Sequence, residues 1–364
     1  MADTIRLSVD AMGGDKGPRV VVEGAMLALK ERRNTSFILH GRREELEPLV
    51  AMHPELKAAS EIRHAEIVVA MDDKPSAALR KGRGNSSMWA ALQSVKDGEA
   101  DVAVSGGNTG ALMAMSTFCL RPVEGISRPA IAAIWPTLRA DIVVCDVGAK
   151  IGGDARQLVD FAIVGSALAR ALFDQELPRV GLLNVGTEEL KGHEEVKDAA
   201  RILAEASGAG FVYHGFVEGD DIGKGTVDVV VTDGFTGNIA LKTAEGTARQ
   251  VGTYVRQALN GDFMSKLGAL IAGQAINALR RKMDPRTVNG GVFLGLNGTV
   301  IKSHGGTDEI GFRSALGLAY EMSRSRLLDK IVDGVRRFPA TSFSPPTAPP
   351  GVAAPISEAE AKPA

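Results

Sequence analysis

Short apolar runs alternate with longer stretches of helical periodicity from the first residues to about residue 330. Several of these runs are apolar at both odd and even positions, which is typical of strands covered by helices on both faces of a sheet. The alternation therefore predicts an α/β fold in which parallel strands are joined by crossover helices. The predicted strands are Ile5–Val9, Phe37–His40, Asp101–Ser105, Ile142–Asp146, Val180–Val185 and Val227–Thr232.

The pattern ends near residue 337. Residues 338–364 are rich in Pro, Ala and Ser and carry too few large apolar side chains to bury a core. We therefore expect one α/β unit over residues 1–337, followed by a disordered C-terminal tail over 338–364.

Composition limits the kinds of molecule that the protein is expected to bind. The chain has 364 residues, 45% of them hydrophobic, and a net charge of −2, so no global positive field favours nucleic acid. The two cysteines, Cys119 and Cys145, lie inside apolar stretches, which fits a reducing compartment and buried thiols. No apolar run is long enough to span a membrane, so we expect a cytoplasmic protein with at most peripheral contact at the inner face of the cell membrane.

Four glycine-rich junctions follow predicted strands and precede helical patterns. Free N–H groups at the start of a helix can bind an anion, and in open parallel sheets ligands bind at the carboxyl ends of the strands. Gly, Asn, Asp and Thr also form ordinary turns and caps, but their recurrence favours one composite site for a phosphate or carboxyl group. The candidate binding residues are Asp10, Gly13, Gly14, Asp15, Ser105, Gly107, Asn108, Thr109, Asn184, Gly186, Thr187, Asp233 and Thr236.

Known nucleotide motifs do not match these junctions. The first turn reads GGDKG and not the G-x-G-x-x-G of dinucleotide folds, so NAD is not indicated. The segment EGDDIGKGT has one residue too few between its glycines for a P-loop and has Gly225 after the lysine, so ATP is not indicated. There is no clustered Cys/His ligand set, and we expect neither a metal nor another cofactor.

Two further residues have a polar setting that fits either chemistry or ordinary structure. His304, in IKSHGGTDE, follows an apolar run and precedes two glycines. It is either a site residue or a loop histidine that makes one backbone hydrogen bond. Lys191, in EELKGHEE, is either a cation for phosphate or a solvated charge among glutamates.

Residues 254–285 combine an apolar stripe with basic side chains. Val255, Leu259, Phe263, Leu267 and Ile271 recur at four-residue spacing, and Lys266 and the run Arg280–Lys282 lie nearby. Such a segment can pack on a dimer mate or lie in a membrane interface, and its cations could instead meet an acidic carrier protein.

The segments VDAMGGD, SGGNTGALMA, CDVGAK, LLNVGTEELKG, TDGFTGNIALK and GLNGTVIKSHG together resemble the bacterial acyl-carrier-protein:phosphate acyltransferases of phospholipid synthesis. The likeness runs in consistent order from about residue 5 to 325, although Lys150 stands where the family usually has asparagine. It implies a Rossmann-like fold of the phosphotransacetylase and isocitrate/isopropylmalate dehydrogenase type with a protruding helical segment, a homodimer, and transfer of an acyl group from acyl carrier protein to inorganic phosphate.

A thioester is already activated, so the reaction needs positioning and oxyanion stabilisation more than a strong base. The resemblance therefore suggests Lys191, Asn238 and His304 as catalytic residues, with His304 assisting the departing thiolate, and Asp10 and Asp233 orienting the donors. Two alternatives stay open. One is a phosphotransacetylase-like enzyme using acyl-coenzyme A, and the other is a membrane-associated binding protein without turnover.

Overall fold

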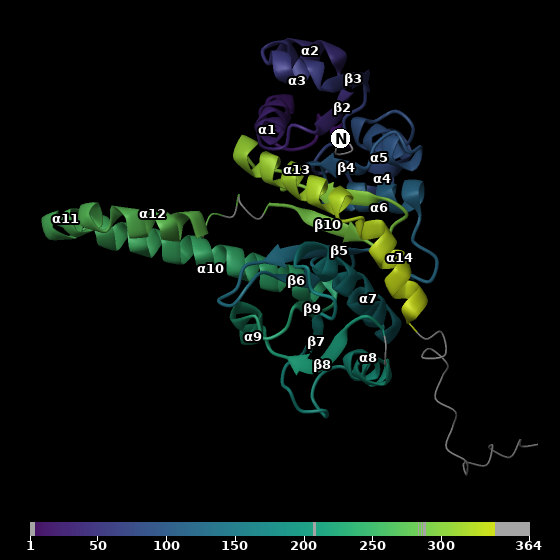
Figure 1. The fold of residues 1–364 in the computed structure, drawn as a ribbon, viewed down its shortest axis with the longest axis vertical. Coiled ribbons are helices and arrows are strands. Elements are labelled where there is room, and N and C mark those ends of the chain that lie inside the picture. The colour runs from purple at the N-terminus through teal and green to yellow at the C-terminus, as the bar shows by residue number, and fades with distance from the viewer. Residues whose placement is uncertain (1–3, 207–208, 283, 285, 287–288, 339–364) are drawn as a thin grey trace, which may run out of the picture.

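The computed structural model describes residues 4–206, 209–282, 284, 286 and 289–338 (Figure 1). One 11-stranded sheet runs through the molecule in the order β3-β2-β1-β4-β11-β10-β5-β6-β9-β7-β8. The strands are β1 (Ile5–Asp10), β2 (Thr35–Gly41), β3 (Ser60–His64), β4 (Val102–Ser105), β5 (Ala130–Trp135), β6 (Ile142–Cys145), β7 (Arg179–Leu183), β8 (Val212–Val217), β9 (Val229–Val231), β10 (Gly291–Leu294) and β11 (Thr299–Lys302).

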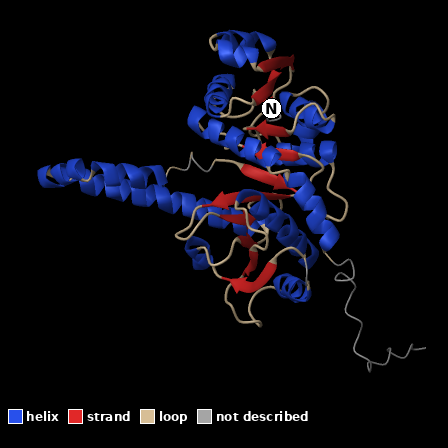
Figure 2. Ribbon diagram, in the orientation of Figure 1, coloured by secondary structure: helices blue, strands red, loops and turns tan. Residues whose placement is uncertain are grey.

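Helices cover both faces of this sheet (Figure 2). They are α1 (Pro18–Glu31), α2 (Arg43–Ala51), α3 (Pro54–Ala58), α4 (Pro75–Gly82), α5 (Ser87–Lys96), α6 (Thr109–Leu120), α7 (Ala155–Leu172), α8 (Glu194–Glu205), α9 (Gly219–Lys224), α10 (Gly234–Asn260), α11 (Phe263–Ile271), α12 (Gly273–Lys282), α13 (Glu309–Arg324) and α14 (Leu327–Arg337). All six strands predicted from the sequence are present, and the α/β class is confirmed.

The sheet is mixed, which differs from the expectation of parallel strands throughout. Strands β3, β2, β1, β4 and β11 run parallel to one another, as do β6, β9, β7 and β8. Between these groups, β11–β10, β10–β5 and β5–β6 are antiparallel pairs. The two parallel groups therefore point in opposite directions, and the glycine-rich junctions do not all leave the same edge of the sheet.

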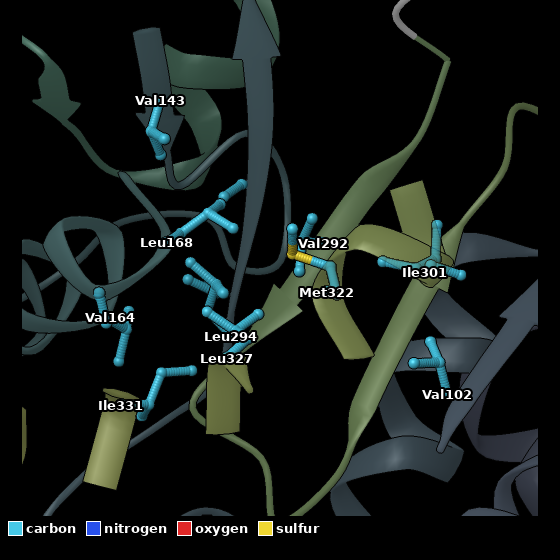
Figure 3. Close-up of a cluster of buried hydrophobic side chains, with 14 of the residues drawn as sticks. Val102, Val143, Val164, Leu168, Val292, Leu294, Ile301, Met322, Leu327 and Ile331 are labelled. Atoms are coloured by element: carbon cyan, nitrogen blue, oxygen red, sulfur yellow. The ribbon is translucent and has the colours of Figure 1, made fainter. Parts of the chain in front are cut away.

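Alternation of side chains along the central strands divides the core into two layers. On one face, Val102 of β4, Val143 of β6 and Val292 of β10 pack with α7, α13 and α14, where Leu168 and Met322 lie (Figure 3). On the other face, the neighbouring residues of the same strands pack with α5 and α6. Burial on both faces explains why these strands read as continuous apolar runs.

An arm formed by α10, α11 and α12 projects from the body (Figure 1). Of α10, only Gly234 and Gly237 are buried, and α11 has no buried residue. The predicted apolar stripe does not lie on one continuous helix, because Gly261 and the N-cap Asp262 separate Val255 and Leu259 from the residues of α11. The side chains of the basic run Arg280–Lys282 lie outside the described structure.

Within the described part of the chain, no helix is both long and apolar enough to cross a membrane. Of the predicted tail, Phe338 is buried against the core. Residues 339–364 lie outside the described residues.

Candidate active site

Three loops meet in a pocket, called here the glycine pocket. It is lined by the loop after β1, the loop after β4 and the loop after β11, and it is open to solvent. The lining residues are Gly13, Gly14, Lys16, Gly17, Val20, Val21, Gly106, His304, Gly305, Thr307 and Phe312. The three loops are fastened to one another, since Asp15 N–H donates to Gly305 O at 2.9 Å and Ser303 N–H donates to Ser105 O at 2.9 Å.

Glycine is required where the first two loops touch. A Cβ on Gly13 would lie 2.6 Å from Asp10 Oδ2 and 2.7 Å from the amide nitrogen of Gly107. Below this contact, the buried Ser105 hydroxyl donates to Asp10 Oδ2 at 2.7 Å and accepts from Gly107 N–H at 3.0 Å. Asp10 is 1% exposed, and burial raises the pKa of its carboxyl. The orienting role expected for Asp10 stays a prediction.

The start of α1 points into the same pocket. Its N-cap is Gly17, with a φ of 72°, followed by Pro18 in the first turn, and no side chain caps the helix. The free N–H groups of an uncapped helix start and the partial positive charge there favour an anion. Lys16 beside them adds a full positive charge.

A second cation lies beneath the pocket, and sequence reasoning missed it. Lys302, the last residue of β11, is 9% exposed, and its ammonium donates to the carbonyls of Gly106, at 3.3 Å, and Ser303. Burial lowers the pKa of Lys302 to about 8, against the opposing effect of Asp10 and Asp15. A lysine at the end of a strand ordinarily reads as a surface charge, so only its burial against two carbonyls marks it as part of the site.

His304 lies at the exposed mouth of the pocket. Its backbone N–H donates to Asn289 Oδ1 at 3.0 Å, and Asn289 in turn donates to Ser303 Oγ and Gly311 O. Partial burial lowers the pKa of His304, and the positive charge of Lys242 on α10 lowers it further. A neutral imidazole at this place can donate a hydrogen bond to a departing group near neutral pH.

Asn108 has a structural task. Its side-chain oxygen accepts from Ala111 N–H at 3.0 Å and so caps α6, while its nitrogen donates to Met71 O at 2.8 Å and Asp73 O at 2.9 Å. These bonds fasten the loop before α4 to the pocket. Thr109 is exposed in the first turn of α6.

The junction after β9 forms a second assembly with the loop after β6. Asp233 caps α10 by accepting from Phe235 N–H and Thr236 N–H, and it also accepts from the Thr236 hydroxyl at 2.6 Å. Asn238 is exposed and lies beside Gly148. Sequence reasoning assigned no role to the centre of this assembly, Asp146, which is fully buried.

The Asp146 carboxylate accepts four backbone N–H groups, from Ile131, Gly148, Ala149 and Lys150, at 2.9–3.1 Å. These bonds oppose the rise in pKa that burial causes. The carboxylate therefore fixes the conformation of the loop over residues 146–150 and joins this loop to Ile131 of β5.

The side chains of the junction after β7 contact one another. Asn184 donates to Lys191 O at 3.0 Å, and the Lys191 ammonium pairs with Glu188 at 2.7 Å, which raises the pKa of Lys191. Gly186 is buried beneath the Lys191 side chain, and Thr187 is exposed. None of the described contacts joins this junction to the glycine pocket.

The described contacts thus bring together Asp10, Gly13–Asp15 and Ser105–Gly107 with His304, and place the 184–191 and 233–238 junctions in separate assemblies. No described hydrogen bond joins all four junctions, and the expectation of one composite site stays a prediction. Helix α10 links two of these assemblies, since Lys242 acts electrostatically on both Lys302 and His304. No group of three or more His, Cys, Asp or Glu residues that could hold a metal ion is found among the described residues.

The fold defines a class. A phosphotransacetylase from Streptococcus pyogenes superposes with a TM-score of 0.56 over 90% of this chain and 94% of its own, at 18% identity. A 4-hydroxythreonine-4-phosphate dehydrogenase from Salmonella typhimurium gives 0.50 over 88% and 100% at 15% identity. At these identities the likeness concerns the fold alone, which is that of the phosphotransacetylases and related dehydrogenases.

Sequence similarity identifies the family within this fold. The model of the family described as "Fatty acid synthesis protein" matches residues 5–330. The phosphate acyltransferase of Agrobacterium fabrum is 57% identical over 342 residues, which cover 94% of this chain and 97% of the relative. The chain therefore belongs to this family of phosphate acyltransferases.

Proposed function

We propose that this protein transfers a fatty acyl group from acyl carrier protein to inorganic phosphate and so supplies acyl phosphate for phosphatidic acid synthesis, with residues 1–337 as the catalytic unit. The observation that carries the proposal is the glycine pocket. An uncapped helix start, Lys16 and the buried Lys302 favour a small anion there. Family membership supplies the reaction type.

In the proposed reaction, a phosphate oxygen attacks the thioester carbonyl carbon, forming a C–O bond and an oxyanion. Collapse of this intermediate breaks the C–S bond and releases the carrier as its thiolate. The amides of Gly13–Asp15 and Gly107 would hold phosphate, and His304 at the mouth would donate to the departing sulfur. No protein nucleophile is required, because the thioester is already activated.

Lys191 and Asn238 are proposed to polarise the thioester carbonyl, together with Asn184 and Thr187. Lys191 would first have to exchange its pair with Glu188, 2.7 Å away, for the substrate. Such an exchange is inexpensive, because both partners are at least half exposed and ion pairs of this kind contribute little to stability. Loss of this pair frees the Lys191 ammonium for another anion, and the proposal further requires the 184–191 junction to face the bound thioester.

The arm is proposed to serve assembly and peripheral membrane contact. Phe263, Met264, Leu270 and Ile271 of α11 are between 70% and 81% exposed, and Lys266 stands among them. Apolar side chains with an adjacent cation fit an anionic membrane interface. The exposed apolar residues of α10, such as Val251, Tyr254 and Val255, would pack on a second copy in a homodimer.

The decisive experiment mixes purified protein, a long-chain acyl carrier protein thioester and inorganic phosphate, and traps acyl phosphate with hydroxylamine. We expect phosphate-dependent formation of hydroxamate. Turnover of acyl-coenzyme A at equal efficiency would instead favour the phosphotransacetylase-like enzyme. An absence of product from both donors would favour the binding protein without turnover.

A further inference from the structure

One stretch of this weakly acidic chain is basic without interruption. Residues 74–96 contain five cations and no Asp or Glu, although the whole chain has a net charge of −2. The cations are Lys74, Arg80, Lys81, Arg83 and Lys96, and all are exposed. No ion pair between Lys74, Arg80, Lys81 or Arg83 and a described carboxylate is found, whereas neighbouring arginines such as Arg63 are paired with glutamates. The charges of Arg80, Lys81 and Arg83 therefore face solvent without an ion pair among the described residues, and acidic residues occur only outside the segment, as Asp72 and Asp73 before it and Asp97 and Glu99 after it.

This basic segment begins at the glycine pocket. Asn108, which follows the β4 loop of the pocket, binds the carbonyls of Met71 and Asp73 directly before α4. The Met71 side chain lies against Gly305 in the pocket lining. Helix α4 has eight residues and so extends about 12 Å, and Arg80 and Lys81 lie in its last turn.

An aromatic contact fixes the far end of the segment. The Arg83 guanidinium lies 4.2 Å from the ring centroid of Phe118 on α6 and 5.9 Å from that of Trp89 on α5. Phe118 remains 48% exposed. The surface thus presents a cation held over an apolar ring beside the exposed charges of Arg80 and Lys81, a combination typical of a protein docking surface and not of a solvated helix face.

We propose that α4, Arg83 and Phe118 form the docking surface for the acyl carrier protein. This inference rests on the proposed function, which requires an acidic protein to deliver a thioester to the glycine pocket. A carrier protein bound to α4 would lie near the glycine pocket. Its acidic surface would complement the unpaired cations. Figure 1 shows α4 and the arm on different sides of the body, so docking here leaves the arm free.

The test compares two double charge reversals in the full-length protein. Arg80→Glu with Lys81→Glu changes the proposed surface, and Lys30→Glu with Lys57→Glu applies the same change in charge to exposed residues of α1 and α3. The first variant should raise KM for the carrier thioester about five- to thirty-fold and flatten its dependence on salt. It should leave unchanged both kcat at saturating carrier and KM for phosphate. The control should resemble wild type.

A second readout titrates labelled carrier protein against each variant at low and high salt, without turnover. An equal loss of affinity in both double variants would show an effect of net charge alone, and wild-type affinity in the first would place docking elsewhere; either overturns the proposal. Should reversal disturb folding, Arg80→Gln with Lys81→Gln provides a neutral variant with a smaller expected loss. Failure of the wild type to make acyl phosphate would instead refute the proposed function.

Discussion

The buried Lys302 leads to a prediction that separates stability from function. Burial lowers its pKa from 10.5 to about 8, a shift that corresponds to about 3 kcal/mol. Below pH 8 the lysine is protonated in both the folded and the unfolded state, so the native state bears the full cost of the buried charge. The cost fades between pH 8 and 10.5 and is absent above that range. Lys302 is therefore expected to destabilise the unliganded protein at neutral pH.

Lys302→Met removes the charge and keeps the length of the side chain. It also removes the hydrogen bonds to the carbonyls of Gly106 and Ser303, each worth about 1 kcal/mol. We expect the variant to be about 1–2 kcal/mol more stable than wild type at pH 7, and we expect this advantage to shrink as the pH rises from 8 toward 10.5. KM for phosphate should rise about ten- to a hundred-fold, because a nearby buried cation no longer attracts the dianion.

Urea denaturation at pH 7 and pH 9.5 measures the first effect, and initial rates at varied phosphate measure the second. Lys57→Met, at an exposed position, is the matched control and should change neither quantity. A Lys302→Met protein that is less stable at pH 7 and has an unchanged KM for phosphate would refute the reasoning, because Lys302 would then be a structural residue only.

Three further results are expected. His304→Ala should lower kcat by about a hundred-fold, and His304→Gln should recover part of it through an amide donor, as measured at saturating substrates. Lys191→Ala should lower turnover by a similar factor of about a hundred while Glu188→Ala retains it; near-wild-type turnover of the first at saturating phosphate would remove Lys191 from the mechanism. Leu267→Glu on the arm should abolish co-sedimentation with anionic liposomes, whereas Leu138→Glu, at an exposed position on the body, should not.

The pattern of residue types along the chain was sufficient to predict most of the strands and part of the candidate site. Ile5, Leu7 and Val9 of β1 and the run Val102–Val104 of β4 are apolar, so both strands are visible in the sequence. The glycine pairs that follow them are visible as well, and the structure shows that Gly13 and Gly107 have no room for a Cβ. The pattern could not show that Asn108 and Asp233 are occupied in capping helices, because Asn and Asp suit caps and ligand sites equally well. Asp146 and Lys302 were missed because burial, and not residue type, gives them their importance.

The sequence by itself determined the α/β class, most of the strands, the loops of the glycine pocket and the family. Only the tertiary structure decided which junctions share a pocket, because strand direction is set by pairings between distant segments, such as β5 with β10, that no local pattern records. It also placed α4 beside the pocket and enclosed Lys302 beneath it. Both the position of α4 and the burial of Lys302 depend on contacts between chain segments that are far apart in sequence. The free energy of a buried charge depends on all the groups around it, which local sequence does not show.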